Sequence, residues 1–302
     1  MEMKEFAEIV KKKLAEQTGR EVRVVEVKKN NGLVLHGVII TETESNLMPT
    51  IYLESYLADY EESNGNKGLE EIIEQIKKLW ESNRVRTNVD IDFFPDFERV
   101  KAKLAYKLVN YELNKDLLAE IPHEKFMDLA KIYYIEIENR SLGKGTVTIK
   151  NEYLGIWGIT KERLCSVAEE NMQRRFPMEI KTIEDVIEEI TWGSAKNVEE
   201  NKEIESKSNL YVASNRSRIY GAAVMCYVDK LKEFAEQKKG DLVIFPCSIH
   251  EILIMVWNET MEDIKYFKEM VHEINSSNVD VDDILSNSVY FYDRKTNTIS
   301  VA

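Results

Sequence analysis

Apolar residues recur along the chain with two periods, and their alternation predicts a mixture of helices and short strands. Residues 6–14 have the three-to-four-residue spacing of one helix face, and residues 22–27 and 33–40 alternate as strands do. Asn30-Asn31-Gly32, between those strands, favours a β-hairpin. The same patterns predict further helices over residues 69–80, 160–172, 182–190, 231–240 and 264–274. Further strands are predicted over residues 104–111, 132–137, 146–149, 210–213, 242–245, 249–257 and 288–292, with residues 50–53 as a strand or the entry to a short helix.

Strands and helices do not alternate strictly, and several strand pairs are separated only by short turns such as Gly143-Lys144-Gly145. This order favours an α+β fold, with mixed, mainly antiparallel sheets and packed amphipathic helices, over a doubly wound parallel fold. The pattern changes near residues 145–160. We therefore expect an N-terminal α+β domain over residues 1–150 and a C-terminal α+β domain over residues 151–302, with a single continuous fold as the alternative.

Composition fits a folded protein, because 43% of the 302 residues are hydrophobic. No window approaches about 18 consecutive apolar residues, so no membrane span is expected. The N-terminus is charged and has no signal-peptide pattern, which predicts a cytoplasmic protein. With 41 basic and 54 acidic residues, the net charge is −13. That charge makes direct nucleic-acid binding unfavourable and suits docking onto a basic partner protein, although it also simply favours solubility.

Sequence motifs argue against a cofactor. The three cysteines are scattered, no Cys/His cluster has the spacing of a zinc site, and no glycine-rich nucleotide loop is present. We therefore expect no cofactor and no metal. A catalytic role is uncertain, and the balance of motifs favours a protein without one.

The segment Pro246 to Glu251 carries the most suggestive polar residues. A thiol nucleophile would need Cys247 to meet His250, but residues three apart on a strand point to opposite faces. A zinc-protease motif fails because Ile254 stands where the second histidine would be. A turn after Pro246 can aim several side chains at one spot, where they either bind a small ligand or satisfy the backbone at a sheet corner; the structural role is favoured. The candidate polar cluster is Asn215, Ser248, His250 and Glu251.

Two acidic segments are candidate interaction surfaces. The first combines aromatic anchors with carboxylates, and its alternative is a loop pinned to the core by its phenylalanines, which is favoured. The second, residues 184–205, can imitate nucleic-acid charge or form a solvated helix face with a loop, and the latter is favoured. The candidate docking residues of the first segment are Phe93, Phe94, Phe97, Asp90, Asp92 and Asp96.

A resemblance covers mainly residues 209–293. It is carried by Tyr211 to Asn215, Gly221-Ala222-Ala223, Asp241-Leu242, Pro246, Ser248 to Glu251, Val271, Glu273 to Asn275, Leu285-Ser286, Val289-Tyr290 and Tyr292-Asp293. These residues resemble the DUF5688 family of uncharacterised bacterial proteins, whose members come mainly from gut Firmicutes and their mobile elements. Members carry Ser where this chain has Cys247, which weakens a thiol nucleophile further. The resemblance implies an architecture and a bacterial or phage setting, and it implies no reaction.

These observations leave three functional hypotheses. The first is a non-enzymatic binding protein, an accessory factor of a mobile element or phage that docks on another protein through an acidic surface, with counter-defence as one such role. The second is a small-ligand sensor or hydrolase-type enzyme centred on Ser248, His250 and Glu251. The third is an acidic mimic of nucleic acid.

Overall fold

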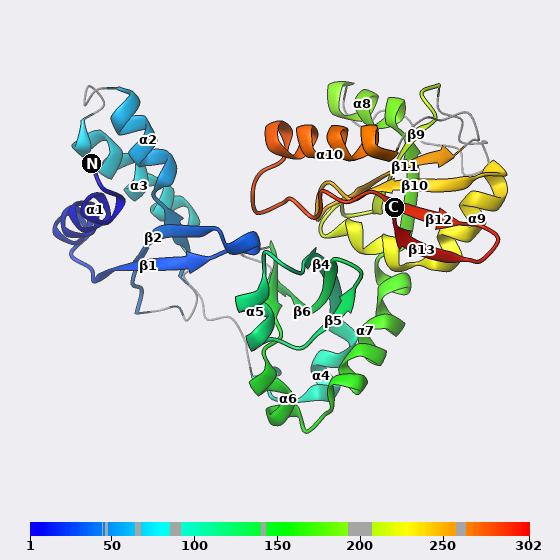
Figure 1. The fold of residues 1–302 in the computed structure, drawn as a ribbon. Helices are drawn as coiled ribbons and strands as arrows, with labels where there is room; N and C mark the ends of the chain where they lie inside the picture. The colour runs from blue at the N-terminus through cyan, green and yellow to red at the C-terminus, as the bar shows by residue number, and fades with distance from the viewer. Residues whose placement is uncertain are drawn as a thin grey trace. The chain divides into compact units, whose positions relative to one another are not determined.

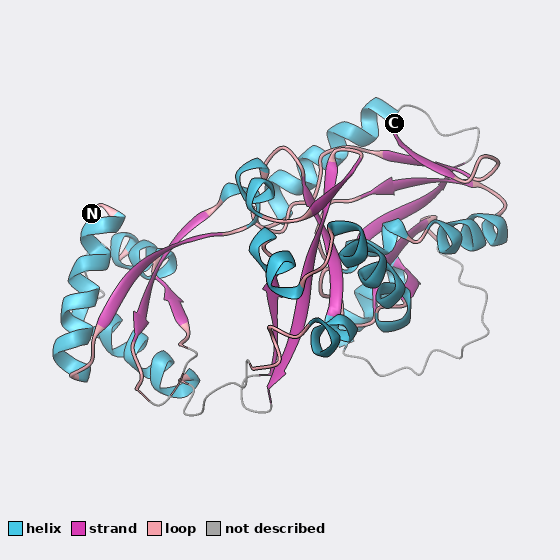
Figure 2. Cartoon of the chain, turned by 90° about the horizontal axis from the view of Figure 1, so that it is seen from below, coloured by secondary structure: helices cyan, strands magenta, loops and turns pink. Residues whose placement is uncertain are grey.

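The computed structural model describes residues 1–43, 45, 48–63, 68–84, 92–139, 143–192, 207–257 and 264–302. It divides the chain into two compact units: unit 1 comprises Met1–Phe93 with Glu138–Gly145, and unit 2 comprises Phe94–Ile137 with Thr146–Ala302 (Figure 1). Helices and mainly antiparallel strands occur in both units, which confirms the α+β class (Figure 2). The domain boundary expected near residue 150 divides the chain differently, and it stays a prediction.

Unit 1 contains a three-stranded antiparallel sheet and amphipathic helices. Asn31 and Gly32 both have positive φ, at 58° and 72°, in the turn joining the first two strands, as the hairpin signal predicted. The strands are β1 (Val22–Lys28), β2 (Val34–Ile40) and β3 (Thr50–Tyr52), and the helices are α1 (Met3–Thr18), α2 (Glu54–Glu62) and α3 (Leu69–Asn83). Their common core includes Phe6, Val10, Leu14, Val38, Ile40, Ile73 and Ile76. Burial of these faces stabilises the unit.

Unit 2 contains strands of a small sheet, ordered β4-β6-β5, with β7 paired to β6. These strands are β4 (Leu104–Asn110), β5 (His123–Phe126), β6 (Leu129–Asn139) and β7 (Gly143–Thr148). The last two residues of β6 and the first three of β7 belong to unit 1. Short helices precede and follow them: α4 (Phe97–Val100), α5 (Lys115–Glu120) and α6 (Asn151–Trp157). Helix α7 (Lys161–Arg175) packs against β4.

The large sheet of unit 2 has six strands in the order β13-β12-β10-β11-β9-β8, and every pair is antiparallel. Its strands are β8 (Met178–Thr182), β9 (Leu210–Asn215), β10 (Asp241–Phe245), β11 (Ile252–Trp257), β12 (Tyr290–Asp293) and β13 (Thr298–Val301). The associated helices are α8 (Ile183–Trp192), the 3-10 helix η3 (Gly221–Cys226), α9 (Val228–Lys238) and α10 (Ile264–Asn278).

Helix starts follow the sequence signals closely. The Thr160 hydroxyl accepts a hydrogen bond from the Arg163 amide, and Thr182 exchanges hydrogen bonds with Asp185 at the start of α8. The hairpin expected around Gly143-Lys144-Gly145 is present, because β7 pairs with β6, but these three residues open β7 and do not form its turn. Among the described helices, none has the length and apolarity needed to cross a bilayer.

Candidate functional site

Three loops of unit 2 meet at residues 214–222, 246–250 and 283–290, and we call this region the three-loop junction. Its middle loop is held through the backbone: the Ile249 amide donates to the Asp283 carbonyl at 2.8 Å, and the Leu285 amide donates to the Cys247 carbonyl at 3.0 Å. The Ile249 carbonyl in turn accepts from the Ala222 amide at 3.2 Å. The strand expected from residue 249 therefore begins only at Ile252, because the preceding backbone pairs with other loops.

His250 uses both of its ring nitrogens inside this junction. Its Nδ1 accepts a hydrogen bond from the Tyr220 amide at 3.3 Å, and its Nε2 lies 3.2 Å from the Asp283 carboxylate. This geometry places the ring proton on Nε2, because Nδ1 faces a donor. The imidazole also stacks on the Tyr220 ring, with centroids 5.9 Å apart. A general base needs a free lone pair, and here a main-chain N–H occupies it.

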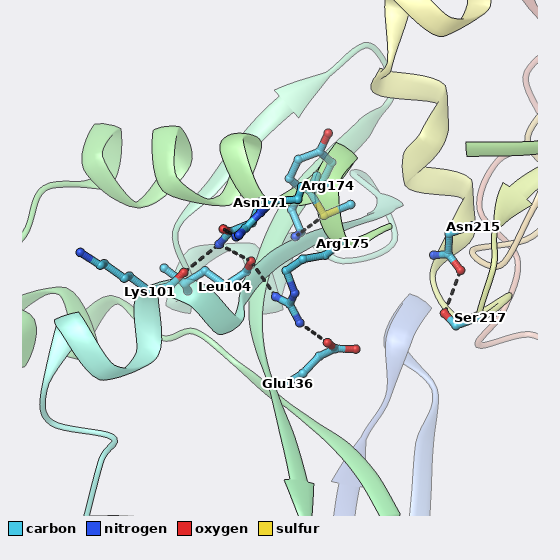
Figure 3. Close-up of polar contacts among 10 residues, drawn as sticks. Lys101, Leu104, Glu136, Asn171, Arg174, Arg175, Asn215 and Ser217 are labelled. Carbon is cyan, nitrogen blue, oxygen red and sulfur yellow. Dashed lines mark hydrogen bonds and ion pairs between the residues drawn. The ribbon is translucent and has the colours of Figure 1, made fainter. Parts of the chain in front are cut away.

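Ser248 and Asn215 likewise support their own loops. The buried Ser248 hydroxyl accepts a hydrogen bond from the His250 amide at 3.0 Å. The buried Asn215 side chain donates to the Ile219 carbonyl at 2.9 Å and accepts from the Ser217 hydroxyl at 2.8 Å (Figure 3). The structure thus brings Asn215, Ser248 and His250 into one junction, where each satisfies local backbone or side-chain groups.

The loop at Gly221 lies so close to the neighbouring loops that a side chain at this position would overlap them. A Cβ atom there would lie 2.0 Å from the Ser214 hydroxyl and 2.4 Å from the His250 carbonyl oxygen. The same loop holds Arg218 and Tyr220 at φ of 52° and 53°, in the left-handed region that side-chain-bearing residues seldom adopt. Only glycine therefore fits at position 221 without displacing a neighbouring loop.

Cys247 is not prepared to act as a nucleophile. Burial, with a smaller contribution from the partly exposed Glu251 carboxylate, raises the pKa of the Cys247 thiol to about 11. Reactive cysteines have lowered pKa values, because the thiolate is the attacking species. The environment of Cys247 shifts its pKa in the opposite direction.

A second loop cluster joins the small sheet to the junction. The Asp128 carboxylate accepts hydrogen bonds from the hydroxyls of Ser286 at 2.6 Å and Ser288 at 2.9 Å, and from the Tyr290 hydroxyl. Burial is the main cause that raises the pKa of the Tyr290 hydroxyl. Ser286 and Tyr290 carry part of the family resemblance. In this structure their hydroxyls stabilise the loop before β12 by donating hydrogen bonds to Asp128.

Figure 3 shows a further polar network with a structural role. The buried Asn171 amide group of α7 donates to the carbonyl oxygens of Lys101 and Leu104 at 2.7 and 3.0 Å. Its carbonyl accepts from the Arg174 guanidinium at 2.9 Å, while Arg175 donates to the Leu104 carbonyl at 3.2 Å. Together these bonds hold α7 against the start of β4.

The candidate docking residues around position 95 make internal contacts. In unit 2, the Phe94 ring packs edge-on against Tyr153, and Phe94 and Phe97 both lie against Trp157, whose indole N–H donates to the Phe94 carbonyl at 2.7 Å. Asp96 caps α4 through the Glu98 amide. In unit 1, Phe93 is buried. Asp92 is exposed, and Asp90 lies outside the described residues. A docking role for this group stays a prediction.

Sequence reasoning missed three exposed apolar side chains on α8. Ile187, Ile190 and Trp192 are 55%, 76% and 81% exposed, whereas Val186 on the same helix is buried. The charged residues of α8 are all acidic: Glu184, Asp185, Glu188 and Glu189. For residues 184–205 the sequence favoured a solvated helix face with a loop, and a helical pattern alone does not tell how far apolar residues on such a helix are covered.

A groove of about 430 Å³ also lies beside β8. Its lining includes Met178 and Ile180 of β8, Tyr227, Phe234 and Gln237 from the α9 side, and Gln173 of α7. Lys230 and Glu233 line it as well, so the groove combines apolar, amide and charged side chains. Within the part of the chain that the structure describes, no group of His, Cys, Asp and Glu could hold a metal ion.

Comparison with known proteins agrees with the resemblance and extends it. The model of the Family of unknown function (DUF5688) matches residues 3–294, nearly the whole chain. No curated protein and no solved structure matches the sequence. Because the family model spans both units and includes the three-loop junction, the chain belongs to the DUF5688 family.

Proposed function

We propose that this chain is a non-enzymatic binding protein that docks on another protein through α8. The observation that carries the proposal is the exposure of Ile187, Ile190 and Trp192 on a helix whose charges are all acidic. Ile187 and Ile190 are three residues apart and share one face of the helix, whereas Trp192 points to another side at its end. Large exposed apolar side chains are typical of interaction sites. Tryptophan in particular contributes strongly when a partner covers it.

The apolar and acidic residues of α8 also indicate what kind of partner would bind. Covering one large apolar side chain is worth roughly 1.5–3 kcal/mol, so Ile190 and Trp192 can each contribute to binding from their own sides of the helix. The surrounding carboxylates favour a partner whose apolar pocket has basic residues at its rim. Lys181 and Arg218 both pair with Glu189, at 2.6 and 2.7 Å, so part of the acidic charge of α8 is neutralised within the protein. The chain's net charge of −13 also favours association with a partner that has a basic surface.

The rival hypothesis of a ligand sensor or hydrolase has less support. Its central residue, His250, has both ring nitrogens engaged by Tyr220 and Asp283. The Ser248 hydroxyl accepts a hydrogen bond from the His250 amide, and no described contact directs this hydroxyl toward the imidazole. A role as an accessory factor of a bacterial mobile element, acting in the cytoplasm, is part of the same proposal and rests on the family resemblance.

The test compares three forms of the full chain as bait in a bacterial lysate. Wild type should retain a stoichiometric protein partner, and Ile190→Ser/Trp192→Ser should lose it. Ile156→Ser is the matched control, because Ile156 is 56% exposed on α6, away from α8. Retention should also weaken with salt, as rim charges predict. Recovery of no stoichiometric partner by wild type, or equal recovery by the α8 variant, would refute the proposal.

A further inference from the structure

Strand β8 forms one edge of the six-stranded sheet. Its five residues pair with β9 from Met178↔Asn215 to Thr182↔Tyr211, and among the described residues no other strand pairs with them. In an antiparallel strand, alternate residues direct their N–H and C=O groups away from the paired neighbour. The outer side of β8 is therefore a row of backbone donors and acceptors that an extended peptide can complete.

The groove described above lies beside this edge. Met178 and Ile180 are two residues apart and so project to the same face, toward Phe234 and Tyr227. A strand added to β8 would direct every second side chain to that face as well. The volume of about 430 Å³ is large enough for apolar side chains of such a strand.

Charge at the edge is balanced within the protein. On β8, Glu179 pairs with Arg216 at 3.1 Å and Lys181 pairs with Glu189 at 2.6 Å. On the α9 wall, Lys230 pairs with Glu233 at 2.7 Å. Charged side chains on an exposed edge usually discourage strand addition, and here each has a partner of opposite charge. The complementary occupant is therefore an extended segment with uncharged apolar residues at alternate positions.

We propose that β8 accepts an extended segment of a partner protein as a seventh strand, with its alternate apolar side chains in the groove between β8 and α9. About five residues, or roughly 17 Å, would match the length of β8. This inference rests on the proposed protein-binding function and names the form in which part of the partner binds. Thr182 ends β8 and caps α8, so the two surfaces adjoin and one partner can contact both.

A library of random twelve-residue peptides, displayed and selected on the full chain, tests this inference. Selected peptides should alternate apolar and polar residues, and synthetic copies should slow hydrogen exchange of amides within residues 178–182. Gln237→Trp fills the groove from an exposed position and should weaken peptide binding at least about tenfold. Glu236→Trp, at the neighbouring exposed position outside the groove, should bind as wild type.

The inference is overturned if selection enriches no peptide, if enriched peptides leave the β8 amides unprotected, or if Gln237→Trp binds them as well as Glu236→Trp. These results separate it from the proposed function. Loss of the lysate partner on changing Ile190 and Trp192, with no effect of Gln237→Trp on that partner or on any peptide, would leave docking through α8 and remove the β8 mode. Peptide binding at β8, with no effect of the α8 variant on the lysate partner, would support strand addition at β8 and remove docking through α8.

Discussion

His250 Nε2 lies 3.2 Å from the Asp283 carboxylate, although the two residues are 33 positions apart in the sequence. The bond links the loop after β10 to the loop before β12, and the Tyr220 amide completes the arrangement from the loop after β9. In this arrangement the imidazole connects three loops. Several residues that carry the family resemblance thus share one structural purpose.

Replacing His250 tests that purpose. We expect His250→Ala to lower the free energy of unfolding by about 2–3 kcal/mol, because it removes two hydrogen bonds and leaves the Tyr220 amide without its acceptor. Urea denaturation followed by circular dichroism measures the change. His272→Ala, at an exposed position of α10, should change stability by less than about 0.5 kcal/mol. Equal stability of both variants would mean that the hydrogen bonds of the His250 ring do not stabilise the fold.

Gly221 allows a sharper test of packing. Gly221→Ala should cost about 3 kcal/mol or more, since the new methyl group would overlap the Ser214 hydroxyl and the His250 carbonyl. Gly155→Ala is the matched control. Position 155 lies within α6 with open space around the added Cβ, so alanine should be neutral or stabilising by up to about 1 kcal/mol. Thermal unfolding of the pair gives the comparison, and similar melting temperatures would contradict the tight junction.

The raised pKa of the buried Cys247 thiol predicts that the stability of the protein depends on pH. Its thiol pKa rises from an ordinary value of 9.0 to about 11 on folding, because burial disfavours the thiolate. The unfolded chain therefore loses this proton at lower pH than the folded chain. The stabilisation is fully present below pH 9 and is lost as pH rises from about 9 to about 11, amounting to roughly 2–3 kcal/mol.

Other buried groups titrate in the same range, so the contribution of Cys247 must come from a difference between variants. The stability of Cys247→Ala should fall less steeply between pH 9 and pH 11 than that of wild type. Denaturant unfolding at several pH values measures both slopes. Parallel curves would show that the Cys247 thiol has the same pKa in both states.

Asp128 and Tyr290 should be energetically coupled. The Asp128 carboxylate accepts hydrogen bonds from the hydroxyls of Tyr290, Ser286 and Ser288, so Asp128→Ala and Tyr290→Phe remove parts of one network. A double-mutant cycle should give a coupling free energy of about 1–3 kcal/mol. Asp116→Ala, at an exposed position of α5, should add independently to Tyr290→Phe. Simple additivity in the first cycle would rule out a shared network.

Local signals account for much of the fold that the sequence predicted. The Asn31-Gly32 turn and the threonine caps at positions 160 and 182 act on neighbouring residues, so one stretch of sequence contains their full physical cause. β8 was missed because its five residues include two charged side chains whose partners lie outside the strand: Arg216 is 37 positions from Glu179, and Glu189 is eight positions from Lys181. Strand propensity does not report such long-range compensation.

The candidate site was predictable only in part. Asn215, Ser248 and His250 do meet, as a turn after Pro246 suggested, but their partners decide what they do. Asp283, which fixes the imidazole, has no sequence motif that would single it out. Nor could periodicity reveal which apolar residues of α8 are exposed beside its buried Val186, because coverage depends on where other elements lie.

The strand order of the large sheet has a consequence for synthesis of the protein. β10 lies inside the sheet, yet one of its two neighbours is β12, which comes from residues 290–293. While a ribosome is still adding those residues, β10 has an unpaired flank, and the loop at residues 246–249 lacks the main-chain partners found at residues 283–286. A premature stop codon near position 280 would therefore release a polypeptide with a bare interior strand, which is a substrate for aggregation and proteolysis.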